Sequence, residues 1–323
     1  MKILQPLLAL FLMAFAQALY AQAYPIRHVT MIVPFPPGGP TDVYGRAVAE
    51  AMARALGHAV VVENVPGAGS TIGTGRAAAA APDGYTLLLL GPSLPIASAL
   101  YGNLPYDPVR DLAGVGLVNY GPQLIVGRKD LPATDIAGLV KWMKEPGRRV
   151  RFAHAGVGSL AHLCGVLFAD LVKVEVDHVP YRGSGPALND VIGGHVDLTC
   201  AGLSAGQYVR SGALKGYGVT SRERSGALPG IESFVQAGYP AMDINSWHAL
   251  FTRSGAPAPV LARLNDALRQ ALKDPKVIST FERTGVLIYP ASEQTPEAAS
   301  GILRSEIKRW GELIREHNIA PSS

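Results

Sequence analysis

The stretch VTMIVPFPPGGPTDVYGRAVAEAMARAL, residues 29–56, joins an apolar run to an amphipathic pattern through a Pro/Gly loop. Residues 29–35 read as a strand buried on both faces. From residue 42 onward, small and apolar side chains recur every three or four positions, which predicts a helix with Thr41 or Asp42 as its N-cap. A buried strand followed at once by such a helix is the repeating unit of parallel α/β sheets.

The same alternation continues along the chain. Further strands are predicted at residues 59–65, 85–90, 123–127, 150–154, 177–181, 195–200 and 215–220. Further helices are predicted at residues 72–81, 136–144, 160–172, 186–192, 257–273 and from 295 onward. We therefore expect an α/β fold with parallel sheets, right-handed crossovers and two lobes of about 100 residues or more each. The two C-terminal helices are amphipathic, and we expect them to cover the N-terminal sheet.

The N-terminus has the composition of a secretory signal peptide. Lys2 is the only charged residue before Arg27, and an apolar run ends in the small-residue site Ala21-Gln22-Ala23. We predict a signal peptide over residues 1–23, with cleavage after Ala23 and with cleavage after Ala18 or Ala21 as alternatives. A retained N-terminal anchor is the other interpretation, but the apolar run is short of a membrane span. Export predicts a periplasmic protein.

Composition narrows the function classes. Hydrophobic residues make up 48% and charged residues 17% of the chain, which is typical of a well-packed globular protein. The net charge is +4, but the basic residues are scattered and aromatic side chains do not interleave with them. We therefore expect no nucleic-acid partner, and a mild positive field that favours anionic solutes.

Cysteine and histidine give weaker signals. Cys164 and Cys200 are the only two cysteines. In an oxidising compartment they form a disulfide, or else they are two small buried apolar side chains, and the sequence leaves both open. The eight histidines are scattered without ligand spacing, so we expect no metal site and no cofactor.

Gly-rich loops recur between a predicted strand and a predicted helix. They are PPGGPT (36–41), PGAGST (66–71), GVGS (156–159), RGSG (182–185) and GLSAG (202–206). Ligands of parallel α/β sheets bind at the carboxyl ends of the strands, where helix N-termini offer free N–H groups to anions. Several such loops from two lobes predict a cradle for a carboxylate, whereas each loop alone is explained as a tight turn.

Two motifs suggest other functions. Residues 67–73 resemble a dinucleotide fingerprint, but the third glycine is one residue late. The GLSAG segment matches the nucleophile elbow of serine hydrolases around Ser204, with Asp243 and His248 following in hydrolase order. These two residues are only five positions apart, so an exported serine hydrolase is kept as the alternative function.

Several longer segments together identify a family. They are VPFPPGGPTDVYGR (33–46), ENVPGAGSTIGT (63–74), PDGYTLLL (82–89), LPYDPVRDL (104–112), AGVGSLAHL (155–163) and VPYRGSGPALNDVIGGHVDL (179–198). With them, the chain resembles the Bug-type periplasmic receptors, the substrate-binding components of tripartite tricarboxylate transporters.

The resemblance implies a two-lobed, type II-like Venus-flytrap fold with mainly parallel sheets and two crossing strands. It implies that residues 24–122 and 247–323 form lobe 1 and residues 123–246 form lobe 2. A monomer without catalytic activity would capture a small carboxylate between the lobes and deliver it to integral-membrane permease subunits. A receptor that presents its ligand to a sensor kinase is the second alternative.

The ligand-binding residues predicted from the loops and the resemblance come from both lobes. They are Phe35, Pro36, Gly38, Gly39, Thr41, Asp42, Gly67, Ala68, Gly69, Ser70, Ser93, Gly156, Gly158, Ser159, His162, Arg182, Gly183, Asp197, Gly202 and Ser204. The chain departs from the family pattern at Val65, where an Arg is usual, and at Ala201-Gly202, where a Phe-Asp pair is frequent. The identity of the carboxylate therefore stays open among dicarboxylates, tricarboxylates, acidic amino acids and aromatic acids.

Overall fold

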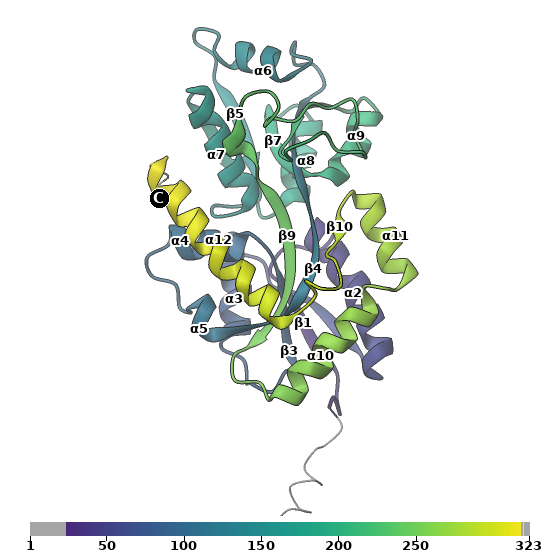
Figure 1. The fold of residues 1–323 in the computed structure, drawn as a ribbon. Coiled ribbons are helices and arrows are strands. Elements are labelled where there is room, and N and C mark those ends of the chain that lie inside the picture. Colours follow the sequence, from purple (N-terminus) through teal and green to yellow (C-terminus); the bar gives the residue numbers. More distant parts are fainter. Residues whose placement is uncertain (1–23, 318, 320–323) are drawn as a thin grey trace, which may run out of the picture.

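A computed structural model describes residues 24–317 and 319 of the chain. The predicted signal peptide lies outside the described residues. Two lobes stand one above the other and are joined by two long strands, β4 (Leu112–Arg128) and β9 (Asn245–Arg253) (Figure 1). No helix in the described part of the chain has the length and apolar character needed to cross a membrane.

Lobe 1 is built on three parallel strands. They are β1 (Val29–Val33), with β2 (Val60–Asn64) on one side and β3 (Thr86–Leu90) on the other. The segment quoted first forms β1 and the helix α2 (Pro40–Leu56) as predicted, but its N-cap is Gly39. Thr41 and Asp42 were the wrong caps because Pro40 is pre-shaped for the first helical position and starts the helix earlier.

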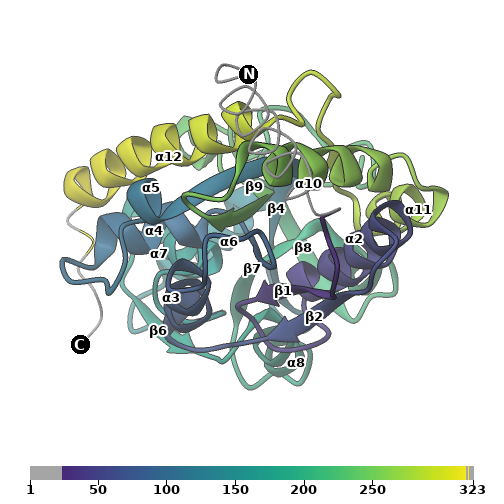
Figure 2. The same cartoon turned by 90° about the horizontal axis from the view of Figure 1, so that it is seen from below.

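Both faces of this sheet are covered by helices from distant parts of the chain (Figure 2). Alternate side chains of β3 enter two apolar clusters, with Leu87 and Leu89 in one and Leu88 and Leu90 in the other. The first cluster is closed by α2, α10 (Ala258–Ala271) and α11 (Pro275–Thr284). The second cluster contains residues of α3 (Thr71–Ala78), α4 (Ser93–Leu100) and α12 (Pro296–Glu316). A short helix, α5 (Pro108–Asp111), directly precedes β4. The expectation that C-terminal helices cover the N-terminal sheet is confirmed.

Strand β4 links the lobes because its pairing partner changes along its length. Up to Pro122 it pairs antiparallel with β9, and from Gln123 it pairs antiparallel with β7 (Leu198–Gly202) and β8 (Leu214–Val219). The short β10 (Leu287–Ile288) also pairs with β4. The described strands thus form one continuous sheet in the order β2-β1-β3-β9-β4-β7-β5-β6, with antiparallel pairs at its centre and parallel pairs at its ends.

Lobe 2 repeats the strand–helix alternation. Strand β5 (Val150–His154) pairs in parallel with β6 (Val176–Pro180) and β7, and the helices are α6 (Ile136–Met143), α7 (Leu160–Val172), α8 (Ser184–Ile192) and α9 (Gly206–Arg210). A disulfide joins Cys164 of α7 to Cys200 of β7, with an S–S distance of 2.11 Å. Of the two alternatives left by the sequence, the structure therefore has the disulfide.

Helix α12 runs from lobe 1 towards lobe 2 (Figure 1). Trp310 and Ile314, near its C-terminus, belong to the apolar cluster that also contains Phe168 of α7. His317, just after the helix, forms a pair with Asp170 of α7. The end of the chain therefore contacts lobe 2 as well as lobe 1, and the predicted assignment of all of residues 247–323 to lobe 1 stays a prediction.

Candidate functional site

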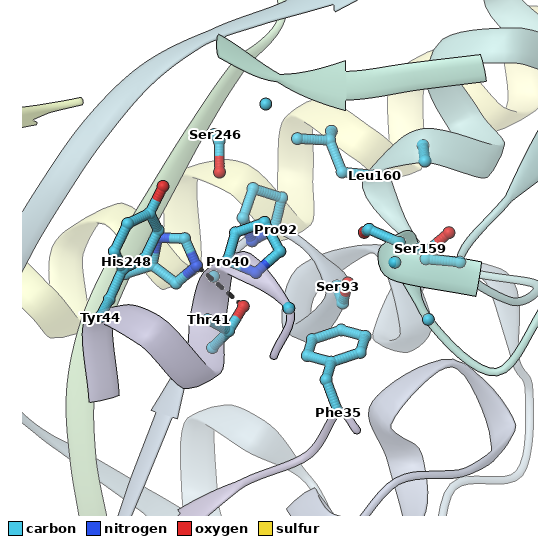
Figure 3. Close-up of a pocket in the computed structure, with 18 of the residues that line it drawn as sticks. Phe35, Pro40, Thr41, Tyr44, Pro92, Ser93, Ser159, Leu160, Ser246 and His248 are labelled. Atoms are coloured by element: carbon cyan, nitrogen blue, oxygen red, sulfur yellow. Dashed lines mark hydrogen bonds between the residues drawn. The ribbon is translucent and has the colours of Figure 1, made fainter. Parts of the chain in front are cut away.

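A cavity of about 110 Å³ lies between the lobes, where the loops that precede four helices meet. It is lined by residues of both lobes, including Phe35, Thr41, Ser93 and Ser159 (Figure 3). The volume is several times what one water molecule needs and suits a small organic solute.

Four helix N-termini contribute to the cavity wall. In lobe 1 they are those of α2, at Gly39 and Pro40, and α4, at Pro92 and Ser93. In lobe 2 they are those of α7, at Ser159, and α8, at Gly183 and Ser184. The first-turn N–H groups of a helix have no partner within it, and the helix dipole is positive at that end. The cavity is therefore favourable for an anion on both sides.

The described residues that line the cavity include no Asp, Glu, Lys or Arg. Their polar side chains are hydroxyls of Ser, Thr and Tyr together with Gln123 and His248. Attraction for an anion must then come from backbone dipoles and neutral hydrogen-bond donors and not from a basic side chain.

The lobes touch around this cavity. A Cβ atom placed on Gly69 of lobe 1 would lie 1.9 Å from the carbonyl oxygen of Val157 in lobe 2. A Cβ on Gly183 of lobe 2 would lie 3.0 Å from Cδ of Pro36 in lobe 1. The hydroxyl of Tyr101 donates a hydrogen bond of 3.4 Å to Val157 O. These contacts describe a closed arrangement of the two lobes.

The loop that carries Gly69 is conformationally strained. Ala68 and Ser70 have φ values of +44° and +93°, a region that side-chain-bearing residues rarely occupy. The cost of each such residue is about 1–3 kcal/mol, and strain of this kind concentrates at ligand-binding segments. It holds the loop in the shape that meets Val157 of the opposite lobe.

His248 of β9 fixes one polar group of the wall. Its Nδ1 lies 2.9 Å from Asn119 Oδ1. Its Nε2 lies 3.2 Å from Thr41 Oγ1 (Figure 3). Burial lowers the pKa of His248 to about 4, so the ring is neutral at pH 7. Because Oδ1 only accepts, Nδ1 carries the proton and the Thr41 hydroxyl donates to Nε2. Thr41 Oγ1 is thereby left as an acceptor on the cavity side.

Tyr44 packs against this pair. Its ring is edge-on to His248 with the ring centroids 5.1 Å apart, and burial raises its phenol pKa to about 12. The phenol therefore stays neutral at every physiological pH.

Of the predicted ligand-binding residues, eight line the cavity. They are Phe35, Pro36, Gly39, Thr41, Ser93, Ser159, Gly183 and Gly202. Seven of them lie in the loops or first helical turns that follow β1, β3, β5 and β6, and Gly202 ends β7, which is the placement expected for the carboxyl ends of parallel strands. Their role in ligand binding stays a prediction.

The other twelve predicted residues lie outside the cavity wall. They are Gly38, Asp42, Gly67, Ala68, Gly69, Ser70, Gly156, Gly158, His162, Arg182, Asp197 and Ser204. Asp42 accepts hydrogen bonds from Gly38 N–H, Arg46 and Asn64, so it orders the loop. Asp197 accepts from Arg128 Nε and Arg151 N–H and holds lobe 2 together.

Sequence reasoning missed the contribution of the crossing strands. Pro122 and Gln123 of β4 and Ser246 and His248 of β9 all line the cavity. No Gly-rich loop marks these positions, and His248 was considered only as a hydrolase base. The predicted crossing strands could have indicated these residues, because a strand that connects two lobes runs beside the cleft between them.

The groups needed for the hydrolase alternative are engaged elsewhere. Both ring nitrogens of His248 have the partners named above, and Asp243 pairs with Arg222 at 2.8 Å. Ser204 lies in a short 3₁₀ helix (Leu203–Ala205) outside the cavity wall. The geometry thus offers no support for Ser204 as a nucleophile.

Comparison with known proteins gives a consistent result. Residues 44–319 match the family model described as the tripartite tricarboxylate transporter family receptor. Among solved structures, the periplasmic binding protein BugD is 37% identical with a TM-score of 0.89, covering 93% of this chain and 100% of that one. MatC from Rhodopseudomonas palustris with bound malate is 34% identical with a TM-score of 0.87, covering 90% and 100%.

A third solved structure, an R. palustris protein with adipate, is 28% identical with a TM-score of 0.86 and covers 93% of this chain and 100% of that one. These likenesses confirm the predicted two-lobed periplasmic-binding-protein fold.

Proposed function

Because the chain belongs to the tripartite tricarboxylate transporter receptor family, a family of periplasmic solute-binding receptors, we propose that it closes its two lobes on one small carboxylate. The observation that carries this proposal is the convergence of four helix N-termini on a cavity whose described lining has no charged side chain. Each pair of N-termini belongs to a different lobe, so an anion between them stabilises the closed form.

The chemistry of the wall suggests what else the solute carries. Two carboxylate groups at opposite ends of one small molecule match the two pairs of helix N-termini. Thr41 Oγ1, held as an acceptor by His248, matches a hydroxyl or ammonium group on the solute. Malate and adipate bound to two structural relatives support a dicarboxylate.

The receptor would be exported to the periplasm with cleavage of its signal peptide, and it would deliver the bound solute to a membrane permease. The closed form brings the surfaces of the two lobes into one fixed arrangement, which a permease can distinguish from the open form. Deletion of the cognate permease genes is expected to abolish uptake of the solute while binding by the purified receptor is unchanged.

A thermal-shift screen of the purified mature protein tests the binding proposal. The panel contains malate, aspartate, succinate, adipate, citrate and benzoate, with glucose and putrescine as a neutral and a cationic control. A ligand of the closed form at a hundredfold excess over its Kd is expected to raise Tm by about 5 °C or more.

We expect malate or aspartate to raise Tm more than succinate does. Succinate lacks the hydroxyl or ammonium group that would donate a hydrogen bond to Thr41 Oγ1. A shift with glucose or putrescine and none with any carboxylate would overturn the proposal. Equal shifts with malate and succinate would leave the carboxylate site standing and refute the role of Thr41.

A further inference from the structure

Lobe 2 contains a group of three histidines on neighbouring elements. His154 ends β5, His178 lies on the adjacent strand β6, and His162 is in the first turn of α7, the helix that packs against both strands. In the register of the two strands, Phe152 faces His178, so His154 and His178 are two positions apart on the same side of the sheet. The three histidines are 8 and 16 residues apart in the sequence, which is longer than the short spacings typical of metal ligands. The sequence therefore predicted no metal site.

The three imidazoles face one another in a largely closed space. One ring nitrogen from each lies within 4.8 Å of the others, and the ring centroids are 4.5, 5.4 and 5.9 Å apart. His154 and His162 are buried, and His178, on the edge strand of the sheet, is half-buried. Of the three rings, His178 is the one that is exposed in part to solvent.

Two of the nitrogens have no partner to satisfy them. Nδ1 of His154 and Nδ1 of His178 are buried and make no hydrogen bond to the described residues. A buried polar atom left without a partner costs about 1–3 kcal/mol, so a pair within one cluster calls for an explanation.

Each neutral imidazole offers a metal ion one lone pair. At His162, Nδ1 accepts a hydrogen bond of 3.4 Å from Gly158 N–H, and metal binding at this ring would replace that bond or use the other ring nitrogen after a tautomer change.

We propose that His154, His162 and His178 bind one divalent first-row transition-metal ion, for which Zn²⁺ is the reference. Neutral imidazole suits Zn²⁺, Cu²⁺ and Ni²⁺, whereas Mg²⁺ and Ca²⁺ prefer oxygen ligands. Three imidazoles supply three positions of a tetrahedron and leave one for water. Bonds of about 2.0–2.1 Å place the nitrogens about 3.3 Å apart, so modest side-chain rotation closes the group around the ion.

The site lies directly behind the wall of the solute cavity. Ala155, which follows His154, and Ala161, which precedes His162, both line that cavity. The ion would tie the end of β5, the edge strand β6 and the N-terminal turn of α7 into one unit. It would thereby stiffen the lobe 2 half of the cavity, although metal binding itself needs no carboxylate.

The test uses the mature chain without a polyhistidine tag, treated with chelator and then titrated with Zn²⁺ against a competing indicator. Binding of one Zn²⁺ per chain is expected, with a Kd of about 1 µM or tighter. Titration with Co²⁺ is expected to give the intense visible absorption of a four-coordinate site. Because both cysteines are in the disulfide, no thiolate of the described chain contributes to that spectrum.

His154→Gln and His178→Gln are each expected to weaken Zn²⁺ binding by about 100-fold or more. His195→Gln, an exposed histidine of the same lobe, is the matched control and is expected to bind Zn²⁺ like the wild type. Circular dichroism establishes that each variant is folded, and the half-buried His178 is the position least sensitive to substitution. Wild-type binding weaker than about 100 µM, or equal binding by the wild type and both cluster variants, would overturn the proposal.

Discussion

At the scale of single residues, the cavity is shaped by positions where a side chain is missing. Gly69 has a φ of +61° and approaches the backbone of the opposite lobe more closely than any Cβ atom permits. Its neighbours Ala68 and Ser70 hold positive φ values to keep it there. Closure of the lobes thus depends on the absence of one methyl group.

Gly69→Ala is accordingly expected to weaken solute binding by about 10-fold or more while leaving each lobe folded. The added Cβ meets the Val157 carbonyl oxygen, which cannot move away without opening the lobes. The matched control is Gly57→Ala at the end of α2, where φ is +76° and nothing lies within 4 Å. Both variants carry the cost of a left-handed residue, about 1–2 kcal/mol. Calorimetric titration that finds equal affinities for the two variants would refute the closure contact.

His248 gives the molecule a measurable acid sensitivity. Its folded-state pKa of about 4 is below the ordinary value of 6.5, so the unfolded chain binds the proton more tightly. The stability that this difference supplies is fully present above pH 6.5 and is lost as the pH falls towards 4, by up to about 3 kcal/mol.

We expect His248→Gln to reduce the pH dependence of the unfolding free energy between pH 6.5 and 4.5, measured by urea unfolding. The other buried histidines are retained in both proteins, so the difference between the two slopes isolates this ring. Identical slopes for the wild type and the variant would contradict a neutral, buried His248.

At the scale of elements, local patterns predicted the strands that alternate with helices, but of the two strands that cross between the lobes they predicted only residues 123–127. Residues 150–154 and 160–172 were bounded correctly because an apolar run and a helical period are local signals. Most of β4 was missed because Gly114, Gly116 and Gly121 weaken its strand pattern. A Cβ on Gly114 would meet Pro296 O at 2.6 Å, so that glycine records packing against α12, which is remote in sequence.

The residues of the site that could be predicted from the sequence are those in loops after parallel strands. Loops after parallel strands could be predicted because strand direction fixes their common edge. The wall residues of β4 and β9, and the three-histidine group, depend on contacts between segments far apart in the chain. Local periodicity carries no information about such contacts.

The disulfide is the element-scale feature with the largest expected effect on stability. It joins α7 to β7 across 36 residues of chain, and the loop-entropy relation gives about 4 kcal/mol. We expect the double variant Cys164→Ala/Cys200→Ala to lose that amount in urea unfolding. Reductant is expected to destabilise the wild type comparably and to leave the double variant unchanged. A loss below about 1 kcal/mol in both experiments would contradict a native disulfide.

At the scale of the whole molecule, three segments pass between the lobes. Strands β4 and β9 form the crossing. Trp310 and Ile314, near the end of α12, share an apolar cluster with residues of α7, and His317, just after α12, pairs with Asp170 of α7. The cavity lies beside this crossing, so strands that connect the lobes also form part of the wall. A solute in the cavity would thereby be coupled to the relative position of both lobes.

The central claim is that backbone dipoles of both lobes bind the negative charge of the solute without a basic side chain. The most direct measurement is calorimetric titration of the mature protein with the best carboxylate of the panel and with its primary amide, which has the same shape and no charge. We predict a Kd of about 10 µM or tighter for the carboxylate and at least about 100-fold weaker binding of the amide. Equal binding of the acid and its amide would contradict the account.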